Sequence, residues 1–337
     1  MKVLVTGGAG FIGAALCHRL LERGDHVFAV DNLSDYYAVS LKQARLDRLL
    51  GRDNFAFQRL DIADRAATGE LFRARKFDAV MHLAAQAGVR YSLENPAAYV
   101  DANLVGFGNV LEGCRRIGVA HLVFASSSSV YGANTRLPFS EADPADHPVS
   151  LYAATKKANE LMAHAYAHLY RLPCTGLRFF TVYGPWGRPD MAFFKFADLM
   201  LRGHPIPVYN HGDLTRDFTY IDDIVEGMVR VLDTPAKAAP DHDARTPNPA
   251  ISDAPFRLYN IGNGNQVRLT DYIHALEDAL GVTARYEMLP MQAGDVAATG
   301  AHMDALANDF DFRPATSIEA GLAAFAEWYR TYYGIPR

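Results

Sequence analysis

A tyrosine and a lysine four residues apart form the pair in this sequence that is best suited to proton transfer. Tyr152 and Lys156 lie in a segment with helical periodicity, so their side chains project from one face of a helix. A free phenol has a pKa of about 10 and is a poor base at neutral pH. Lowering it by roughly three units requires about 4 kcal/mol, which two nearby positive charges can supply in a dry site. The same spacing also occurs on exposed helix faces, so the surrounding residues must decide its meaning.

Four consecutive serines, at residues 126–129, follow directly on an apolar run at residues 121–125. The apolar run is typical of a buried strand, and in open parallel sheets ligands bind beyond the carboxyl ends of the strands. Ser126 by itself could satisfy local turn hydrogen bonds, but four hydroxyls in a row are more than a turn requires. The serines therefore support a catalytic interpretation of Tyr152 and Lys156.

A glycine-rich turn follows the first apolar run. Residues 6–13 read Thr-Gly-Gly-Ala-Gly-Phe-Ile-Gly, and Gly8, Gly10 and Gly13 satisfy the pattern GxGxxG. Residues without a Cβ allow a tight turn and let backbone N–H groups approach a pyrophosphate at the N-terminus of the next helix. Asp31 closes the second strand, where a carboxylate binds an adenosine ribose diol and repels a 2′-phosphate. We therefore predict NAD rather than NADP, and its positive nicotinamide would be the second charge beside Tyr152.

Strand-like runs and amphipathic helices alternate through the first half of the chain. The expected strands are residues 2–6, 26–30, 78–83 and 121–125, and the expected helices are residues 14–23, 97–117 and 153–170. This alternation predicts an α/β fold: a doubly wound parallel sheet of the Rossmann type, covered by helices on both faces. Asp61 and Ile62 follow a further strand, and they form either a plain turn or a cap on the adenine.

The second half of the chain has a different pattern of expected secondary structure. After about Tyr183, glycine and proline become more frequent and the helical stretches shorten. Residues 234–255 are rich in proline, alanine and aspartate, which is typical of an exposed loop. We expect residues 1–180 to form the NAD-binding domain, with later segments returning to it. Residues 181–337 are then expected to form mainly a smaller C-terminal α/β lobe that binds the substrate.

Composition excludes several other classes of protein. The chain has 337 residues, half of them hydrophobic, and a formal net charge of −5, so nothing favours nucleic acid or an anionic membrane as a partner. Cys17, Cys114 and Cys174 are far apart, which argues against a disulfide framework or a metal site. The apolar run before the glycines is too short for a signal peptide, and no run of about 18 apolar residues occurs. We expect a cytoplasmic protein.

With these motifs in view, the chain resembles the extended short-chain dehydrogenase/reductase family over essentially its whole length. The resemblance rests on the glycine turn, His82-Leu-Ala-Ala85, Ser-Ser-x-x-Val-Tyr-Gly, Tyr-x-x-x-Lys and Arg178-Phe-Phe-Thr-Val-Tyr-Gly-Pro185, in that order. Within the family it is most similar to the UDP-glucuronate 4-epimerases. That finer resemblance is carried by Gln86-Ala-Gly-Val-Arg90-Tyr-Ser, Pro185-Trp-Gly-Arg188-Pro-Asp-Met191 and Met291-Gln-x-Gly-Asp-Val296.

The resemblance implies a residue set for each part of the site. The catalytic residues would be Tyr152, Lys156 and Ser127. NAD would contact Gly7, Gly10, Phe11, Ile12, Gly13, Asp31, Asn32, Asp61, Ile62, Leu83, Ala84, Ala85, Asn103, Ser126, Tyr152, Lys156 and Phe179. A UDP-hexuronic acid substrate would contact Gln86, Arg90, Ser127, Ser128, Ser129, Thr181, Arg188, Val208, Arg216 and Asp295. A homodimer, assembled through a helix bundle that includes the Tyr152 helix, is also implied.

The resemblance implies the following chemistry. Tyr152, helped by Ser127, removes the proton of the sugar 4-hydroxyl while hydride leaves carbon 4 for NAD. The 4-keto sugar then turns about its diphosphate link and takes the hydride back on its other face. Reversal of this kind requires that UDP is held firmly and the sugar loosely.

Related enzymes of the family that catalyse other reactions carry different residues where this chain has its serines. A 4-keto uronic acid is a β-keto acid that loses CO2 readily, and related decarboxylases carry a glutamate where Ser129 stands. Ser128, Ser129 and Thr181 offer neutral hydroxyls that could hold the carboxylate out of the reactive geometry. The Asp-Glu pair of the 4,6-dehydratases has no counterpart here. UDP-glucuronate decarboxylase and neutral UDP-glucose 4-epimerase remain alternatives, and a non-enzymatic NAD sensor is disfavoured because Tyr152 and Lys156 are both present.

Two arginines are candidates for anionic parts of the substrate. Arg188 suits a carboxylate or a diphosphate, unless it is a surface residue of its glycine- and proline-containing loop. Arg216 matches the family arginine that clamps the diphosphate, and residues 205–208 resemble the segment that cradles uracil. The chain departs from the family pattern in two places. It lacks the arginine that neutral-sugar relatives place near Gln292, and His302 stands where most relatives have an acid.

Several other residues are expected to pack rather than to react. His82 lies in an apolar run and is expected to be a core histidine. The aromatic residues Trp328, Tyr329, Tyr332 and Tyr333 follow helical spacing and are expected to pack together. Trp186 could either border the sugar or pack.

Overall fold

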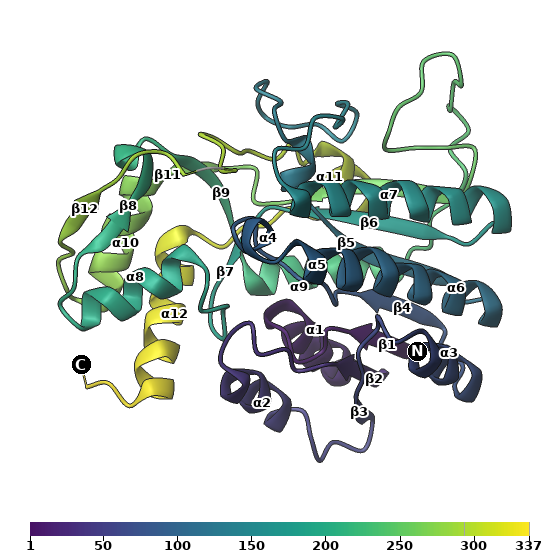
Figure 1. Ribbon diagram of the computed structural model, residues 1–337, viewed down its shortest axis with the longest axis horizontal. Helices are drawn as coiled ribbons and strands as arrows, with labels where there is room; N and C mark the ends of the chain where they lie inside the picture. The colour runs from purple at the N-terminus through teal and green to yellow at the C-terminus, as the bar shows by residue number, and fades with distance from the viewer. Residues whose placement is uncertain (293, 337) are drawn as a thin grey trace.

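A seven-stranded parallel sheet forms the centre of the molecule (Figure 1). The computed structural model describes residues 1–292 and 294–336. The strand order is β10-β6-β5-β4-β1-β2-β3, and every neighbouring pair is parallel. The strands are β1 (Lys2–Thr6), β2 (His26–Asp31), β3 (Phe55–Arg59), β4 (Ala79–His82), β5 (His121–Ser127), β6 (Cys174–Phe179) and β10 (Phe256–Ile261). This confirms the predicted doubly wound fold.

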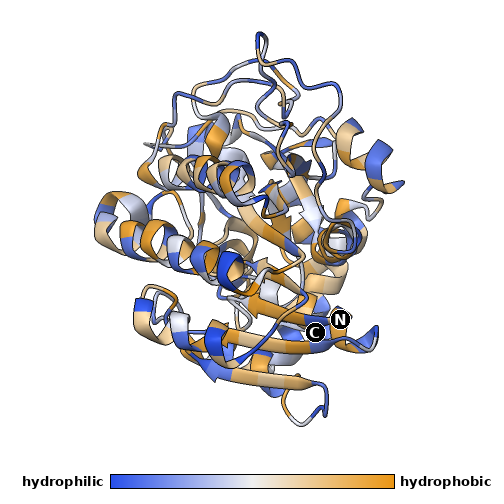
Figure 2. Ribbon diagram, turned by 90° about the vertical axis from the view of Figure 1, so that its right-hand side faces the viewer, coloured by the Kyte–Doolittle hydropathy of each residue, from blue (hydrophilic) through white to orange (hydrophobic). Residues whose placement is uncertain are grey.

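Helices cover both faces of this sheet, because its strands carry apolar side chains on both sides. In β1, Val3 and Val5 join one hydrophobic cluster, whereas Leu4 joins the cluster on the opposite face. The first face is covered by α1 (Phe11–Glu22) and α9 (Ile221–Leu232). The second face is covered by α3 (Arg65–Ala74), α6 (Phe107–Ile117) and α7 (Leu151–Tyr170). Figure 2 shows the strands of the sheet as largely hydrophobic and the helices as two-sided.

The predicted helix over residues 97–117 is confirmed, but it is not α-helical throughout. The structure has α5 (Pro96–Tyr99), then a π-helical turn (Val100–Gly106), and only then α6. Apolar periodicity indicates that the segment is helical, but it does not by itself distinguish α-helical from π-helical hydrogen bonding. The turn places Asn103 in the interior, where it is 1% exposed.

The predicted helix over residues 153–170 is confirmed with an earlier start. The Ser150 hydroxyl accepts the backbone N–H of Ala153 and caps α7. Tyr152 therefore stands in the first turn of the helix, at the carboxyl edge of the sheet. Strand β5 is two residues longer than predicted, so that Ser126 and Ser127 belong to the strand itself.

A smaller lobe packs beside the carboxyl end of the main sheet (Figure 1). Its strands are β7 (Thr181–Tyr183), β8 (Ile206–Val208), β9 (Thr215–Tyr220), β11 (Gln266–Arg268) and β12 (Tyr286–Met288). Its main helices are α8 (Ala192–Leu201), α10 (Leu269–Leu280) and α12 (Ile318–Tyr333). Trp328, Tyr329, Tyr332 and Tyr333 pack on one another and on Trp186 and Phe194 of this lobe. Packing is thus the role the structure shows for these aromatic residues.

Four shorter segments complete the architecture. They are α2 (Val39–Asp47), α4 (Tyr91–Glu94), α11 (Asp304–Phe310) and residues 234–255. The last of these contains neither helix nor strand and extends from the body of the molecule, as predicted (Figure 1). The return of α9 and β10 to the main sheet agrees with the expected layout, whereas the boundary at residue 180 stays a prediction. Among the described helices, none has the length and apolar character needed to cross a membrane.

Candidate active site

The glycine turn after β1 depends on the absence of side chains at particular positions. Gly7 has φ +73°, in the region that favours glycine. A Cβ on Gly13 would lie 2.1 Å from the Gly7 carbonyl oxygen, so α1 can approach the turn only with glycine there. A Cβ on Gly10 would come within 3.0 Å of the same oxygen. The turn therefore brings the N-terminus of α1 against the end of β1.

The N-terminus of α1 fits a dinucleotide phosphate. Its N-cap, Gly10, provides no side-chain hydrogen bond, and the first turn contains no acidic residue. The first backbone N–H groups of a helix, here those of Phe11, Ile12 and Gly13, have no intrahelical acceptor. Oriented donors at the positive end of the helix dipole are suited to a pyrophosphate. The chain therefore supplies the cradle that NAD requires.

Asp31 stands at the carboxyl end of β2 and is largely buried. Its carboxylate accepts hydrogen bonds from the backbone N–H groups of Ala9, at 3.1 Å, and Leu33, at 2.8 Å. The same side chain thus joins the glycine turn to the loop after β2. Asn32 donates to the Asp61 carboxylate at 3.1 Å, which links that loop to the turn after β3.

For Asp61 and Ile62 the structure shows the turn, one of the two possibilities left by the sequence. The Asp61 carboxylate accepts the backbone N–H of Ala63 at 2.9 Å, as in an Asx turn. Ile62 is 6% exposed and belongs to the hydrophobic cluster under α3 and α6. Contact of either residue with the cofactor stays a prediction.

His82 is a core histidine, as expected. It is buried, its Nδ1 lies 2.9 Å from the Thr6 hydroxyl, and burial lowers its pKa to about 3. The same Thr6 hydroxyl accepts the backbone N–H groups of Leu83 and Ala84. Thr6 therefore sets the path of residues 83–85 past the glycine turn.

Asn103 fixes the neighbouring substrate segment through its amide. Its oxygen accepts the backbone N–H of Gln86 at 2.8 Å, and its nitrogen donates to the Gln86 carbonyl and to the Thr155 hydroxyl. All three contacts are to protein, so the side chain acts as a bracket between the π-helical turn and α7. A direct contact of Asn103 with NAD stays a prediction.

The structure brings together the three predicted catalytic residues. Tyr152 and Lys156 project from the first turns of α7 toward the end of β5, where the Ser127 hydroxyl is close enough to the Tyr152 phenol to act on its pKa. The Lys156 ammonium donates to the Ala125 carbonyl oxygen at 2.8 Å. The Tyr152 ring is held edge-on by Tyr99, with centroids 6.1 Å apart.

The ionisation of this group differs from the sequence-based expectation. Burial raises the pKa of Tyr152, while the Ser127 hydroxyl and the Arg188 guanidinium act in the lowering direction and Asp190 in the raising direction. Burial lowers the pKa of Lys156 to about 8. Lowering of the phenol pKa in the protein itself thus comes from Ser127 and Arg188, whereas the lysine had been expected to provide it.

The four serines have different surroundings. Ser126 donates to the buried Glu160 carboxylate at 2.6 Å, and Glu160 also forms an ion pair with Arg178. The hydroxyl of Ser126 is therefore used inside the fold, which leaves its backbone for any contact with NAD. Ser127 and Ser129 hydroxyls lie 3.0 Å apart.

Three hydroxyl residues lie at the junction of the main sheet and the lobe. Ser128 and Ser129 follow β5 in a single 3₁₀ turn, and Thr181 begins β7 shortly after β6, the neighbour of β5. All three side chains are half-buried rather than sealed in the core. Phe179, predicted to contact NAD, ends β6 and is 8% exposed.

Arg188 forms a bidentate ion pair with Asp190. Its Nε and Nη2 donate to the two carboxylate oxygens at 3.0 and 2.5 Å. The arginine side chain is 23% exposed, which excludes the alternative of a free surface arginine. Asp190 and the Tyr99 hydroxyl both lie within 3.8 Å of the Cβ position of Gly88, and Tyr99 packs on Tyr152, so the pair lies in the region of the catalytic tyrosine.

A second basic group lies in the lobe. Arg216 donates to the Asp295 carboxylate at 2.8 Å and to the Ala297 carbonyl oxygen. The Arg90 guanidinium stands 5.1 Å from the centroid of the Tyr209 ring, directly after Val208 at the end of β8. Arg90 is close enough to Arg216 to act on its pKa in the lowering direction, after the larger effect of burial. Two arginines that approach each other in this way suit a diphosphate.

Sequence reasoning missed two residues that hold this region together. Arg45 is fully buried and donates to the Ala9, Trp186 and Gly187 carbonyl oxygens, which ties α2 and the glycine turn to the loop after β7. Asp190 was part of a family motif but had no assigned role. Arginine and aspartate are common on surfaces, and only the fold shows that Arg45 is buried and that Asp190 is half-buried at the site.

Comparison with known proteins agrees with this geometry. A family model described as the NAD dependent epimerase/dehydratase family matches residues 3–245. The chain belongs to this family. The match confirms the resemblance proposed from the motifs, and the NAD dependence of the family agrees with the cofactor predicted from the glycine turn and Asp31.

Individual relatives narrow the comparison. The chain is 49% identical to the "Probable UDP-glucuronate 4-epimerase" of Rhizobium meliloti (strain 1021) over 99% of this chain and 98% of that protein. Among solved structures it matches the UDP-glucuronic acid 4-epimerase from Bacillus cereus in complex with UDP-glucuronic acid and NAD. That match has a TM-score of 0.88 and 33% identity over 99% of this chain and 100% of the other.

A neutral-sugar enzyme has the same fold. The UDP-glucose 4-epimerase of Thermus thermophilus, solved in complex with NAD, matches with a TM-score of 0.83 and 30% identity, over 98% and 99% of the two chains. The overall fold is therefore shared by enzymes with different sugars. The choice of sugar must be argued from the side chains of the site.

Proposed function

We propose that this protein is a UDP-glucuronate 4-epimerase that interconverts UDP-glucuronate and UDP-galacturonate through a 4-keto sugar. The observation that carries the proposal is the set of neutral hydroxyls, Ser128, Ser129 and Thr181, at the junction of sheet and lobe. The named relatives support it. Incubation of the purified protein with each UDP-sugar, with products identified by NMR, tests it.

The cofactor in this proposal is NAD. When bound, NAD accepts the hydride of sugar carbon 4 and returns it. The uncapped N-terminus of α1 supports pyrophosphate binding, and Asp31 disfavours a 2′-phosphate. Among the described residues, no cluster of histidine, cysteine, aspartate or glutamate is arranged to hold a metal ion. The proposed proton transfer needs only side chains of the protein.

Each residue of the chain has a defined task in the proposal. Tyr152 exchanges a proton with the sugar 4-hydroxyl, and Ser127 assists it by acting on the phenol pKa in the lowering direction. Lys156, held on the Ala125 carbonyl oxygen, is not among the groups that lower the phenol pKa in the structure, so its proposed task is to support the phenolate once substrate and cofactor have excluded water from the site. In the lobe, Arg216 and Arg90 bind the diphosphate, and Val208 borders the uracil.

The decarboxylase alternative is disfavoured by the same side chains. A decarboxylase of this family would carry a glutamate at the position of Ser129. Here Ser129 is a neutral hydroxyl whose partner is Ser127. A hydroxyl can hold a carboxylate in place without repelling it. The neutral 4-epimerase alternative is disfavoured because the chain lacks the arginine that neutral-sugar relatives place near Gln292.

Removal of one of these hydroxyls is expected to allow decarboxylation of the 4-keto sugar as a side reaction. Thr181→Ala or Ser129→Ala should slow epimerisation of UDP-glucuronate and raise release of a UDP-4-keto-pentose, because the carboxylate is less firmly held. A lost hydrogen bond to a charged group is worth roughly 1.5–3 kcal/mol, which is about a tenfold or larger loss of specificity for the uronic acid.

Product analysis by NMR measures both effects. Thr331→Ala, at an exposed hydroxyl on α12, serves as the matched control and should behave as wild type. If Thr181→Ala and Ser129→Ala both epimerise at the wild-type rate without leakage, the hydroxyls do not hold the carboxylate.

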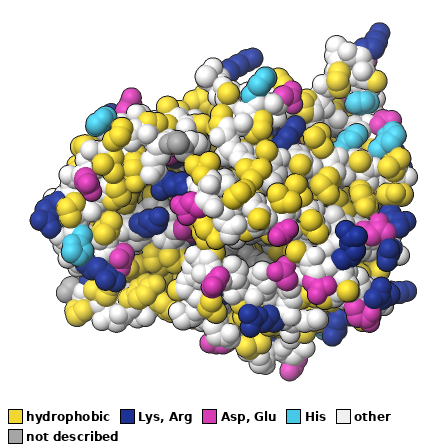
Figure 3. Space-filling model, viewed as in Figure 1, with side chains coloured by type: hydrophobic (Ala, Val, Ile, Leu, Met, Phe, Trp, Pro, Cys, Tyr) yellow, Lys and Arg dark blue, Asp and Glu magenta, His cyan; other side chains and the backbone are white. Residues whose placement is uncertain are grey.

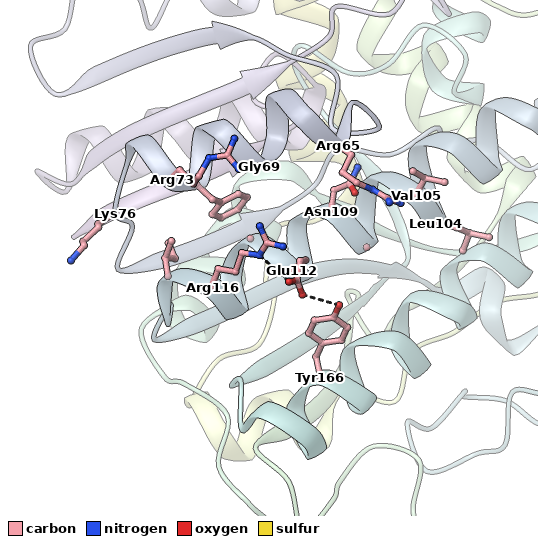
Figure 4. A pocket seen from close by; sticks show the side chains of 14 residues that line it. Arg65, Gly69, Arg73, Lys76, Leu104, Val105, Asn109, Glu112, Arg116 and Tyr166 are labelled. Carbon is pink, nitrogen blue, oxygen red and sulfur yellow. Dashed lines mark hydrogen bonds and ion pairs between the residues drawn. The ribbon is translucent and has the colours of Figure 1, made fainter.

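A homodimer is the second part of the proposal. Exposed apolar side chains gather on the outer side of the π-helical turn and α7, and Figure 3 shows hydrophobic side chains over these helices. They are Val100, Val105, Leu161, Leu169 and Tyr170. Beside them, between α3 and α6, lies a groove of about 740 Å³ that is lined by both charged and apolar side chains, among them Arg73, Glu112 and Val105 (Figure 4). An apolar face of this kind supports burial against a second copy.

A charge placed in this face is expected to prevent assembly. Leu161, on α7, is 61% exposed in the single chain. Leu161→Glu should give a monomer by light scattering with an unchanged circular dichroism spectrum, because a carboxylate cannot be buried unpaired. Leu50→Glu, at an exposed leucine after α2, is the control and should remain dimeric. A wild-type monomer at working concentration would contradict the proposal.

A further inference from the structure

The Arg188–Asp190 pair is built into a rigid loop. Gly184 has φ +137° and Trp186 has φ +63°, so the backbone between β7 and Arg188 follows a path that few residues adopt. Arg45 stabilises this backbone conformation, because it donates hydrogen bonds to the carbonyl oxygens of both Trp186 and Gly187. Because the backbone is fixed independently of the ion pair, the direction of the Arg188 side chain depends on Asp190.

Asp190 also accepts a hydrogen bond from a residue of the NAD-binding domain. The Tyr36 hydroxyl, in the loop after β2, donates to Asp190 Oδ2 at 3.3 Å. Gly88 packs against both groups: a Cβ there would lie 3.0 Å from the Tyr36 hydroxyl and 3.7 Å from Asp190 Oδ2. Its φ of +99° also favours glycine. The carboxylate therefore has partners on two sides and little freedom to turn.

A series of aromatic contacts connects this corner to the catalytic tyrosine. Tyr36 packs on Tyr91 with ring centroids 4.7 Å apart, and Tyr91 lies 6.2 Å from Tyr99. Tyr99 stands 6.1 Å from Tyr152, and its hydroxyl donates to the Gly88 carbonyl oxygen. The ion pair and the catalytic phenol are therefore parts of one packed unit.

The net charge of the Arg188–Asp190 pair matters for a substrate whose sugar must rotate within the site. A guanidinium has five N–H donors, and Asp190 accepts one from Nε and one from Nη2, so three N–H groups remain for other partners. With Asp190 the pair is neutral overall. Without the carboxylate it would present a full, largely desolvated positive charge, which attracts an anion far more strongly.

We propose that Asp190, steadied by Tyr36, is a positioning residue that directs Arg188 and weakens its hold on the sugar carboxylate. This inference rests on the proposed epimerase function. Epimerisation requires that the sugar is released from one orientation and bound in the other between the two hydride transfers. A grip that is too strong stabilises the bound sugar rather than the transition state, so it lowers KM and kcat together.

Asp190→Asn tests the inference because it removes the charge and keeps the shape. With UDP-glucuronate, we expect kcat to fall about tenfold and KM to fall about threefold, since one charge-assisted interaction is roughly worth that much. Tyr36→Phe should change both constants in the same direction by less. Asp243→Asn is the matched control: it breaks an exposed Arg245–Asp243 fork, also two residues apart, and should behave as wild type.

A merely structural role for Asp190 predicts the opposite sign. If Asp190 only kept Arg188 ordered, its loss would raise KM, and that result would overturn the inference. Unchanged constants would overturn it as well.

Binding measurements separate this inference from the proposed function. In a Tyr152→Phe background with NAD, calorimetry gives the dissociation constants of UDP-glucuronate and UDP-glucose. Adding Asp190→Asn should raise the preference for UDP-glucuronate about tenfold. If wild type converts only UDP-glucose, the proposed function fails, yet this preference still decides the role of Asp190: an unchanged or reduced preference would contradict it.

Discussion

Tyr152→Phe is expected to lower turnover of UDP-glucuronate by at least about 100-fold, the lower end of what general acid–base groups contribute. The substitution removes only the phenol hydroxyl, whose pKa Ser127 influences in the lowering direction. The ring keeps its packing on Tyr99, so the binding of NAD and the UDP-sugar should remain within about twofold of wild type. Initial rates, together with calorimetric binding, measure the two effects separately.

A control distinguishes loss of the base from loss of a buried hydroxyl. Tyr183 is fully buried, and its hydroxyl donates a hydrogen bond to the Ser317 carbonyl oxygen. This hydroxyl is not part of the proposed catalytic group. Tyr183→Phe should therefore cost some stability but little activity. Retention of more than a few per cent of the wild-type rate by Tyr152→Phe would show that the phenol is not the proton-transfer group.

Lys156→Met is expected to inactivate the enzyme and to stabilise the fold at neutral pH. The ammonium is 3% exposed, and burial lowers its pKa from 10.5 to about 8. A depressed lysine pKa means that the folded state penalises the charged form, by about 3 kcal/mol when both states are protonated. Methionine has a similar shape without the charge, so the penalty for burying the ammonium disappears. The positive charge that is proposed to stabilise the Tyr152 phenolate is lost as well.

The pH dependence of that stabilisation has a definite sign. Below about pH 8 the lysine is charged in both states, and the variant should be more stable than wild type by the full amount. The difference should shrink as pH rises through 8 and vanish above the unfolded pKa of about 10.5. Denaturant unfolding at several pH values measures it. Lys195→Met, at an exposed lysine on α8, is the control. A variant less stable than wild type at pH 7 would contradict the account.

Much of the site could be predicted from the sequence because its parts obey local rules. Gly7 and Gly13 occupy positions that no other residue fits, and their spacing alone indicates the turn. Tyr152 and Lys156 share a helix face by periodicity, and the serines after β5 lie at the carboxyl edge of the sheet. In each case, the structure confirms a relation between residues that are close in the chain.

Other features depend on contacts between distant segments. Arg45 reaches Ala9, Trp186 and Gly187 across three separate parts of the chain, and no local pattern in its helix indicates this. The π-helical turn at Asn103 lies within a continuously helical segment, and apolar periodicity does not distinguish the two kinds of helix. The direction of the Tyr152 pKa depends on burial and on Arg188, which is 36 positions away in the sequence numbering.

The most direct test of the proposed function is the product formed from UDP-glucuronate. Purified protein incubated with UDP-glucuronate should yield UDP-galacturonate in the NMR spectrum, with little UDP-4-keto-pentose, and UDP-galacturonate should be converted back. UDP-glucose should be a poor substrate in the same assay. Turnover of UDP-glucose that matches or exceeds that of UDP-glucuronate would contradict the account, and a neutral-sugar 4-epimerase would replace it.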